Sequence, residues 1–208
     1  MTLSDKQFKI IGLTGNSGSG KSLIASICAS FGAYIINADD INHANMLAGG
    51  TAYDEICAVF GRGILDELCE IDRRKLGDIV FADNGKLQTL VAITHKHVIA
   101  ETHALISSVL AKPNGYKFII IDAPLLIEAE MHKDCDETWL VTASDETRLE
   151  RIRKRDNLSD EQITKRFAAA TPSSELAKHA DLIIENNFTD IESLEHSIKT
   201  LLIQRSII

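Results

Sequence analysis

Residues 15–22 read GNSGSGKS, the complete pattern G-x-x-x-x-G-K-[ST] of a phosphate-binding loop. Its glycines allow backbone N–H groups to approach a phosphate closely, because no Cβ atoms stand in the way. Lys21 would reach the β- and γ-phosphates, and the hydroxyl of Ser22 would ligate Mg²⁺. The pattern predicts a site for a nucleoside triphosphate with magnesium. Every residue of the loop is expected to contribute: Gly15, Asn16, Ser17, Gly18, Ser19, Gly20, Lys21 and Ser22.

A loop of this kind lies between a buried strand and a helix whose N-terminus faces the anion. Residues 8–13 favour a strand, and apolar residues recur at helical spacing from Lys21 to Phe31. The stretch AYIINADD, residues 33–40, favours a second strand with carboxylates at its C-terminal end. The order strand, helix, strand is typical of a parallel βαβ unit.

The rest of the chain extends this arrangement into an α/β fold. Further strands are predicted within residues 116–126, 137–144 and 180–187, whereas residues 41–111 are predicted to be mostly helical. We therefore predict three layers, with a parallel five-stranded sheet flanked by helices and a helical insert after the second strand.

Three capping signals predict where later helices begin. Ser144 is expected to cap a charged helix, and Ser159 with Gln162 forms a capping box for the next one. Thr189 is expected to cap a C-terminal helix that carries Ile191 on its apolar face.

A kinase would also need an acid near the phosphate-binding loop. Asp39 and Asp40 end the second predicted strand, at the sheet edge where α/β proteins bind ligands. Since successive strand residues point to opposite sides, one of the two should face the nucleotide. It would accept a proton from an acceptor hydroxyl or hold Mg²⁺ through water. An exposed turn at the end of the strand is the alternative.

Basic residues cluster late in the chain. Residues 148–166 hold seven of its 22 Lys and Arg residues, although the net charge is −8. Arg148, Arg151 and Arg155 share one helix face by their spacing. We expect this segment to be a lid that stabilises the transferred phosphoryl group, and a solvated charged face is the alternative.

Composition excludes several classes of protein. With 30 acidic against 22 basic residues, the charge balance argues against nucleic acid or an anionic membrane as partner. The chain lacks the N-K-x-D guanine motif of GTPases and the L-S-G-G-Q type signature of transport ATPases. The four cysteines lack metal-ligand spacing and are expected to be reduced thiols. The polar N-terminus and the absence of a bilayer-length apolar run predict a cytoplasmic protein. We separately expect a monomer or a weak homo-oligomer.

Five motifs, taken in their order along the chain, resemble those of the dephospho-coenzyme A kinase family over residues 8–204. They are LTG…GSGKS, ADD, APLLIE, RIRKRD and ADLIIENN. The resemblance implies ATP-dependent phosphorylation of the ribose 3′-hydroxyl of dephospho-CoA, giving CoA and ADP, with Mg²⁺ as cofactor. It also implies a nucleotide-binding core of residues 1–40 and 112–208 with a lid near 150–170. The insert, residues 41–111, would bind the acceptor.

The same resemblance assigns the site residues. Asp39 would be the base, with Lys21 and Arg151 as the other catalytic residues. ATP would contact the loop and the residues Arg151, Arg155 and Asn186. The acceptor would contact Asp39, His95, Asp122, Leu125 and Glu128.

The chain departs from the family pattern at five positions: Asn37, His43, Lys96, Ala170 and Leu176 stand where Asp, Arg, Pro, Gln and Lys are usual. Each lost charged contact to a phosphate would weaken acceptor binding by about 1.5–3 kcal/mol unless a neighbour compensates. Lys96, Lys178 and His43 are candidate substitutes. Two other functions stay open, a P-loop kinase of another nucleoside-like acceptor and a nucleotide-binding module without turnover.

Overall fold

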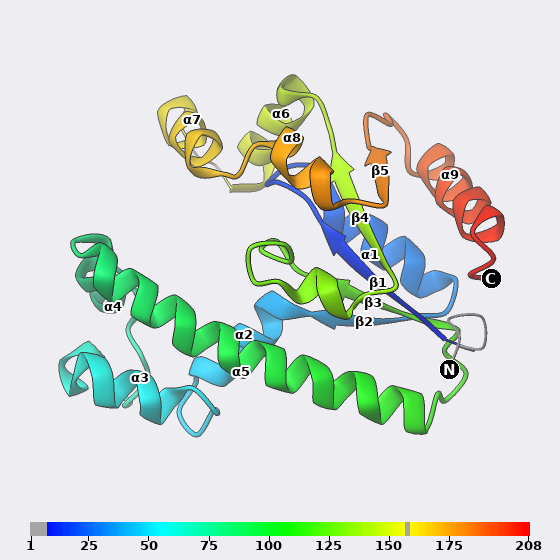
Figure 1. Cartoon of the computed structure of the whole chain (residues 1–208). Helices are drawn as coiled ribbons and strands as arrows, with labels where there is room; N and C mark the ends of the chain where they lie inside the picture. The colour runs from blue at the N-terminus through cyan, green and yellow to red at the C-terminus, as the bar shows by residue number, and fades with distance from the viewer. Residues whose placement is uncertain (1–7, 157–158) are drawn as a thin grey trace. The chain divides into compact units, whose positions relative to one another are not determined.

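The computed structural model describes residues 8–156 and 159–208 (Figure 1). The chain forms two compact units. One consists of residues 1–36 and 109–208 and is called the core unit below. The other consists of residues 37–108 and is called the insert.

A five-stranded parallel sheet forms the centre of the core unit. The strands are β1 (Lys9–Thr14), β2 (Ala33–Asn37), β3 (Phe118–Asp122), β4 (Glu137–Thr142) and β5 (Leu182–Glu185), in the spatial order β2-β3-β1-β4-β5. The predicted α/β fold with this sheet is confirmed. Because β1 is the central strand, the phosphate-binding loop that follows it begins at the middle of the sheet.

One face of the sheet is covered by α1 (Lys21–Ser30) and α9 (Ile191–Gln204), which contact each other (Figure 1). Alternate residues of the strands point into this layer, because side chains on a strand alternate between its two faces. They are Ile11 and Leu13 of β1, Phe118 and Ile120 of β3, and Trp139 and Val141 of β4. Their burial fixes the sheet against α1, and α1 in turn fixes the end of the phosphate-binding loop.

Two helices follow β4, namely α6 (Asp145–Asp156) and α7 (Asp160–Ala169). The predicted caps are confirmed, because Thr147 N donates to Ser144 Oγ at 3.2 Å and α7 begins with the Ser159–Gln162 capping box. Two short helical segments, α8 (Ser173–Leu176) and η4 (Ala177–His179), lead from α7 to β5, and η3 (Met131–Asp134) precedes β4.

The predicted start of the C-terminal helix was wrong by one residue. Asp190 caps α9, with its carboxylate accepting the N–H of Ser193 at 2.7 Å. A carboxylate also gains from the positive end of the helix dipole, which favours Asp190 over the Thr189 hydroxyl. Ile191, expected on the apolar face, is 61% exposed.

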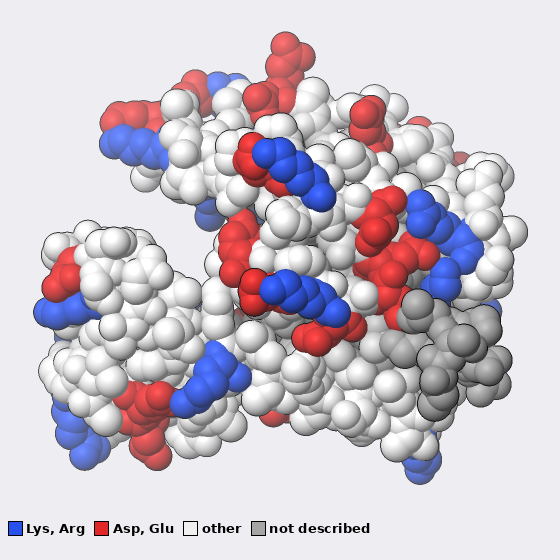
Figure 2. All heavy atoms as spheres, in the orientation of Figure 1, with Lys and Arg blue, Asp and Glu red and all other residues white. Residues whose placement is uncertain are grey.

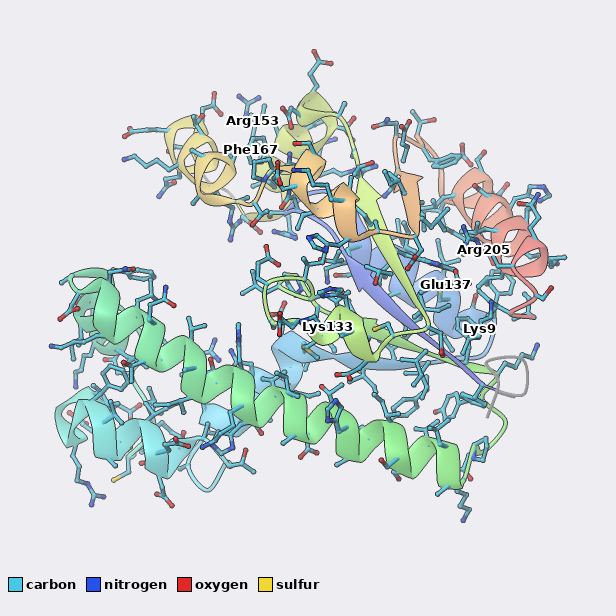
Figure 3. The ribbon with its side chains drawn as sticks, viewed as in Figure 1. Lys9, Lys133, Glu137, Arg153, Phe167 and Arg205 are labelled. Carbon is cyan, nitrogen blue, oxygen red and sulfur yellow. The ribbon has the colours of Figure 1, made fainter. Side chains whose placement is uncertain are left out.

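Lys9 of β1 and Arg205, which follows α9, both contact Glu137 of β4, and all three are labelled in Figure 3. The Glu137 carboxylate pairs with Lys9 Nζ at 3.0 Å and with Arg205 at 3.0 Å. Burial alone would raise the pKa of Glu137, but hydrogen bonds from Trp139 and Lys9 outweigh it and lower the pKa. The cluster joins β1 and β4 to the residue that ends α9.

The insert is helical, as predicted. Its helices are α2 (Ala38–Met46), α3 (Tyr53–Phe60), α4 (Arg73–Phe81) and most of α5 (Asn84–Ala111), with a short segment η2 (Arg62–Ile64). They bury a separate small core of Ala52, Ile56, Ile64, Leu76, Val80 and Ile93.

Asp39 and Asp40 do not lie on a strand, so this part of the sequence prediction was wrong. β2 ends at Asn37, whose side-chain oxygen accepts the N–H groups of Asp39 at 2.9 Å and Asp40 at 3.2 Å. This cap starts α2 and places both carboxylates in its first turn. The alternation argument for choosing between them therefore does not apply.

Cys28, Cys57, Cys69 and Cys135 are all free, as expected. Burial raises the pKa of the Cys28 and Cys135 thiols to about 12. On the face drawn in Figure 2, acidic and basic side chains are interleaved rather than gathered into a patch of one sign. Within residues 8–156 and 159–208, no helix is long and apolar enough to cross a membrane.

Candidate active site

The phosphate-binding loop has a backbone shape that glycine alone satisfies at two positions. Gly20 adopts φ +90°, and a Cβ there would lie 2.1 Å from Asn186 Nδ2. Gly18 adopts φ +83°, and a Cβ there would lie 2.7 Å from the carbonyl oxygen of Arg148. Any side chain at either position would be strained and would displace the neighbours that hold the loop.

Side chains from α6 and from the end of β5 hold the loop through its carbonyl oxygens. Arg148 Nε donates to Ser17 O at 3.1 Å, and Arg151 donates to Ser19 O at 3.2 Å and, at 3.4 Å, to Gly18 O. Asn186 Nδ2 donates to Ser19 O at 2.8 Å. These bonds engage oxygens that would otherwise repel a phosphate, and they fix the position of the loop backbone.

The three arginines expected on one face of α6 have different environments. Arg148 is only 8% exposed, lies 4.1 Å over the ring of Phe167 and pairs with Asp145 at 2.8 Å. It therefore braces the loop against α7. The sequence did not reveal that Arg148 supports the loop, because helical spacing alone does not show which of the three arginines is buried.

Arg151 and Arg155 differ in the partner of their charge. Within the described part of the chain, Arg151 bonds to loop carbonyls and forms no ion pair. Arg155 and Arg166 both pair with Asp156, with N–O distances of 2.6 Å. Hydrogen bonds from Arg155 and then from Arg166 hold the pKa of Asp156 well below its usual range. Arg151 thus has an uncompensated charge beside the loop, whereas Arg155 and Arg166 share the carboxylate of Asp156.

Lys21 contacts the carboxylate of Asp122 at the end of β3. Asp122 is 2% exposed, so a buried carboxylate lies beside the loop lysine. The structure thus brings Asp122, which the resemblance assigned to the acceptor, next to the phosphate-binding loop.

The residues present fit a magnesium ion that arrives with a nucleotide. The Ser22 hydroxyl at the start of α1 and the Asp122 carboxylate are oxygen donors, the kind that Mg²⁺ prefers. Nucleotide-bound Mg²⁺ needs one or two such protein ligands, since phosphates and waters supply the others. Among the described residues, no group of three or more His, Cys, Asp or Glu side chains forms a separate metal site.

A chain of hydrogen bonds connects the loop to two later segments of the core unit. Asn16 Nδ2 donates to Thr171 O at 3.1 Å and to Ser173 Oγ at 3.2 Å. The Thr171 hydroxyl donates to Glu128 Oε1 at 2.7 Å. Glu128 and Leu125 are themselves exposed, so both are accessible to a ligand. Sequence analysis missed Thr171, because its role rests on contacts between distant segments.

In the insert, Asp39 lines a pocket of about 410 Å³ together with Asn42, His43 and Arg73 and an apolar wall. Arg73 was not among the predicted site residues, since it is one of three consecutive basic residues with no motif of its own. His95, the remaining predicted acceptor residue, is half-buried on α5.

Two of the three candidate substitutes for lost charges already have carboxylate partners. Lys96 pairs with Glu55 at 2.7 Å, and Lys178 pairs with Glu175 at 2.6 Å. His43, by contrast, contacts the guanidinium of Arg73 through its Nδ1.

Comparison with known proteins agrees with this geometry. The family model for dephospho-CoA kinase matches residues 9–192. The dephospho-CoA kinase of Carboxydothermus hydrogenoformans is 39% identical over 193 residues, covering 93% of this chain and 92% of that protein. That of Aquifex aeolicus is 39% identical over 179 residues, covering 86% and 89%.

Solved structures are similar over almost the whole chain. TT1252 from Thermus thermophilus matches with a TM-score of 0.77 and 30% identity, covering 96% of this chain and 98% of that one. Dephospho-CoA kinase from Campylobacter jejuni matches with a TM-score of 0.68 and 26% identity over the same shares. A shikimate kinase from Acinetobacter baumannii, at 14% identity and a TM-score of 0.53, shares the fold alone. The chain therefore belongs to the dephospho-CoA kinase family, as its motifs predicted, and is an ATP-dependent kinase.

Proposed function

We propose that this protein transfers the γ-phosphoryl group of Mg-ATP to the ribose 3′-hydroxyl of dephospho-CoA. The observation that carries the proposal is the phosphate-binding loop held by α6 and Asn186, with Lys21 at its end and the charge of Arg151 beside it. Phosphoryl transfer depends mostly on positioning and on neutralising charge, and these are the groups that do both.

On the donor side, the backbone N–H groups of residues 15–22 bind the phosphates. Lys21 exchanges part of its contact with Asp122 for the β- and γ-phosphates, and Arg151 stabilises the charge on the transferred group. Ser22 and Asp122 would hold Mg²⁺, which neutralises phosphate charge when bound. Arg155 also binds the phosphates once it leaves Asp156. Asn186 holds the loop by donating a hydrogen bond to Ser19 O.

On the acceptor side, Asp39 orients the 3′-hydroxyl and accepts its proton. Its carboxylate is exposed in the first turn of α2 and lines the pocket of the insert. An unpaired carboxylate within reach of the hydroxyl suffices for this role. His95, Leu125 and Glu128 are proposed as further acceptor contacts.

The test is the formation of ADP and CoA by the purified protein with Mg-ATP and dephospho-CoA. Adenosine, AMP and pantetheine phosphate serve as competing acceptors. Asp39→Asn should lower kcat by about 10² or more, while ATP still binds. Asp40→Asn is the matched control, because Asp40 is exposed in the same helical turn but does not line the pocket.

Three outcomes separate the candidate functions. Transfer to dephospho-CoA alone, lost in Asp39→Asn, supports the proposal. Transfer to another acceptor supports a kinase with a different substrate, and ATP binding without any transfer supports a module without turnover. The cytoplasmic location and the monomeric or weakly oligomeric state stay predictions.

A further inference from the structure

The pocket of the insert combines charged groups with an apolar wall, and its occupant is a separate question from the catalytic base. Its polar side carries Asp39, Asn42, His43 and Arg73, from α2 and the first residue of α4. The rest of the lining is mostly apolar and includes Leu76, Val80 and Phe81 of α4 and Leu87 of α5. A ligand that fits must carry both an anionic group and an apolar part.

Arg73 is the cation of this pocket, and its charge is not neutralised within the described residues. It forms no ion pair there, and its one side-chain partner is Nδ1 of His43. Arg153, Arg155 and Arg166, by contrast, each pair with an aspartate. A guanidinium has about five N–H donors, so the contact with His43 leaves most of them for a ligand.

The start of α4 fixes where Arg73 lies. Asp72 caps this helix by accepting the N–H groups of Arg74 at 2.9 Å and Lys75 at 3.2 Å. Both bonds lower the pKa of Asp72, and the one from Lys75 has the larger effect. They also occupy its carboxylate. The nearest acid in the sequence is therefore used by the helix cap and does not compensate Arg73.

His43, on α2, is the side-chain partner of Arg73. Its ring gives no permanent charge, but it accepts an N–H from Arg73 and so orients a guanidinium that comes from another helix. A planar guanidinium fixed in this way is suited to a phosphate group, which it binds through two parallel hydrogen bonds.

We propose that Arg73, oriented by His43, binds a phosphate of the acceptor, while the apolar wall contacts the acceptor's uncharged arm. The inference rests on the proposed function, and dephospho-CoA has the required chemistry, with a pyrophosphate between its nucleoside and its pantetheine arm. Arg73 is thus a specificity-determining residue, and His43 is a positioning residue that acts through it.

The experiment compares Arg73→Ala, Arg73→Lys and His43→Ala with the wild type in steady-state kinetics. Arg74→Ala is the matched control, because Arg74 is the next exposed residue of α4 and does not line the pocket. Arg73→Ala should raise the KM for dephospho-CoA by about tenfold to 100-fold, with kcat and the KM for ATP changed by less than about twofold. Arg73→Lys should recover part of that loss, because it keeps the charge without the fork.

His43→Ala should raise the acceptor KM by about threefold to tenfold, and adding it to Arg73→Ala should change nothing further. A merely structural role for His43 would instead give additive losses. An unchanged acceptor KM in Arg73→Ala, an equal rise in the KM for ATP, or an equal effect of Arg74→Ala would each overturn the proposal.

Calorimetric titration of dephospho-CoA into each variant separates this inference from the proposed function. If the wild type transfers phosphate and Arg73→Ala binds dephospho-CoA as tightly as the wild type does, the role of Arg73 is refuted but the proposed function is not. Wild type that neither binds nor phosphorylates dephospho-CoA refutes the proposed function and this inference together. Because Arg73 and His43 are exposed, each variant should fold like the wild type. Thermal melts followed by circular dichroism check this.

Discussion

The two units of the molecule present their proposed ligand-binding residues in opposite ways. In the core unit, the phosphate-binding loop is fixed by buried groups such as Arg148 and Asn186, and its glycines have no room for side chains. In the insert, Asp39, His43 and Arg73 are all exposed on helices. Changes in the core unit should therefore disturb stability and phosphoryl transfer together. Changes in the insert pocket should leave stability unchanged and, except at the proposed base Asp39, should alter acceptor affinity alone.

Three of the five positions at which the sequence is expected to depart from the family pattern lie in the insert. Asn37, His43 and Lys96 belong to the insert, where a substituted side chain has room to find a new partner. Of the two departures in the core unit, Leu176 is buried and adds to the packing. Nothing in the structure explains Ala170.

The strongest test of the comparison is Lys21→Ala, in the loop itself. Removing this cation should lower kcat by about 10²–10³, because it takes away the lysine that is proposed to neutralise charge on the reacting phosphates. Steady-state kinetics measure the effect, with Lys133→Ala as control because the exposed side chain of Lys133 pairs with Glu130. A loss of less than tenfold would mean that the loop does not hold the reacting phosphates.

Arg148→Ala tests whether stability and function are coupled in the core unit. It removes a buried charged hydrogen bond to Ser17 and the contact with Phe167, so Tm should fall by about 4–8 °C and ATP affinity should fall with it. Arg153→Ala breaks an exposed ion pair with Asp160 and should lower the free energy of unfolding by no more than about 1 kcal/mol. If Arg148→Ala melts like the wild type, the loop is not braced as described.

Phe81→Ser tests the other half of the comparison. Its side chain is 82% exposed and lines the insert pocket, so the free energy of unfolding should change by less than about 0.5 kcal/mol. The KM for the acceptor should rise by about threefold to tenfold, because apolar contact with the bound acceptor is lost. Leu68→Ser, at a residue equally exposed but outside the pocket, should leave both quantities unchanged. Substantial unfolding in Phe81→Ser would contradict the contrast between the units.

The smallest expected effect concerns the exposed cluster around Asp156. Since Arg155 and Arg166 lower the pKa of Asp156 in the folded protein, the pairing stabilises above the unfolded pKa of about 3.9 and is lost as pH falls below it. The Tm difference between wild type and Asp156→Asn should thus be constant from about pH 8 to 5 and shrink below about pH 4. A difference that already shrinks near pH 6 would point to another titrating group.

Much of the fold could be predicted from the sequence because its signals are local. The pattern GNSGSGKS, the apolar strands and the Ser159 capping box each depend on residues close together in the chain. The errors arose where two local signals compete. Asn37 ends a strand and caps a helix, which moved Asp39 and Asp40 off the sheet, and Asp190 displaced Thr189 as cap of α9.

The sequence by itself determined the phosphate-binding loop, the family and the five-stranded parallel sheet. Only the tertiary structure decided what each charged side chain contacts. Spacings of three and four residues put Arg148, Arg151 and Arg155 on one face of α6. The neighbouring elements make the first a buried brace, the second an uncompensated cation and the third a partner of Asp156. The pairs Lys21–Asp122 and His43–Arg73 likewise join residues from different elements. Charges act over a few ångströms through space, and sequence spacing does not report that distance beyond a single helix or strand.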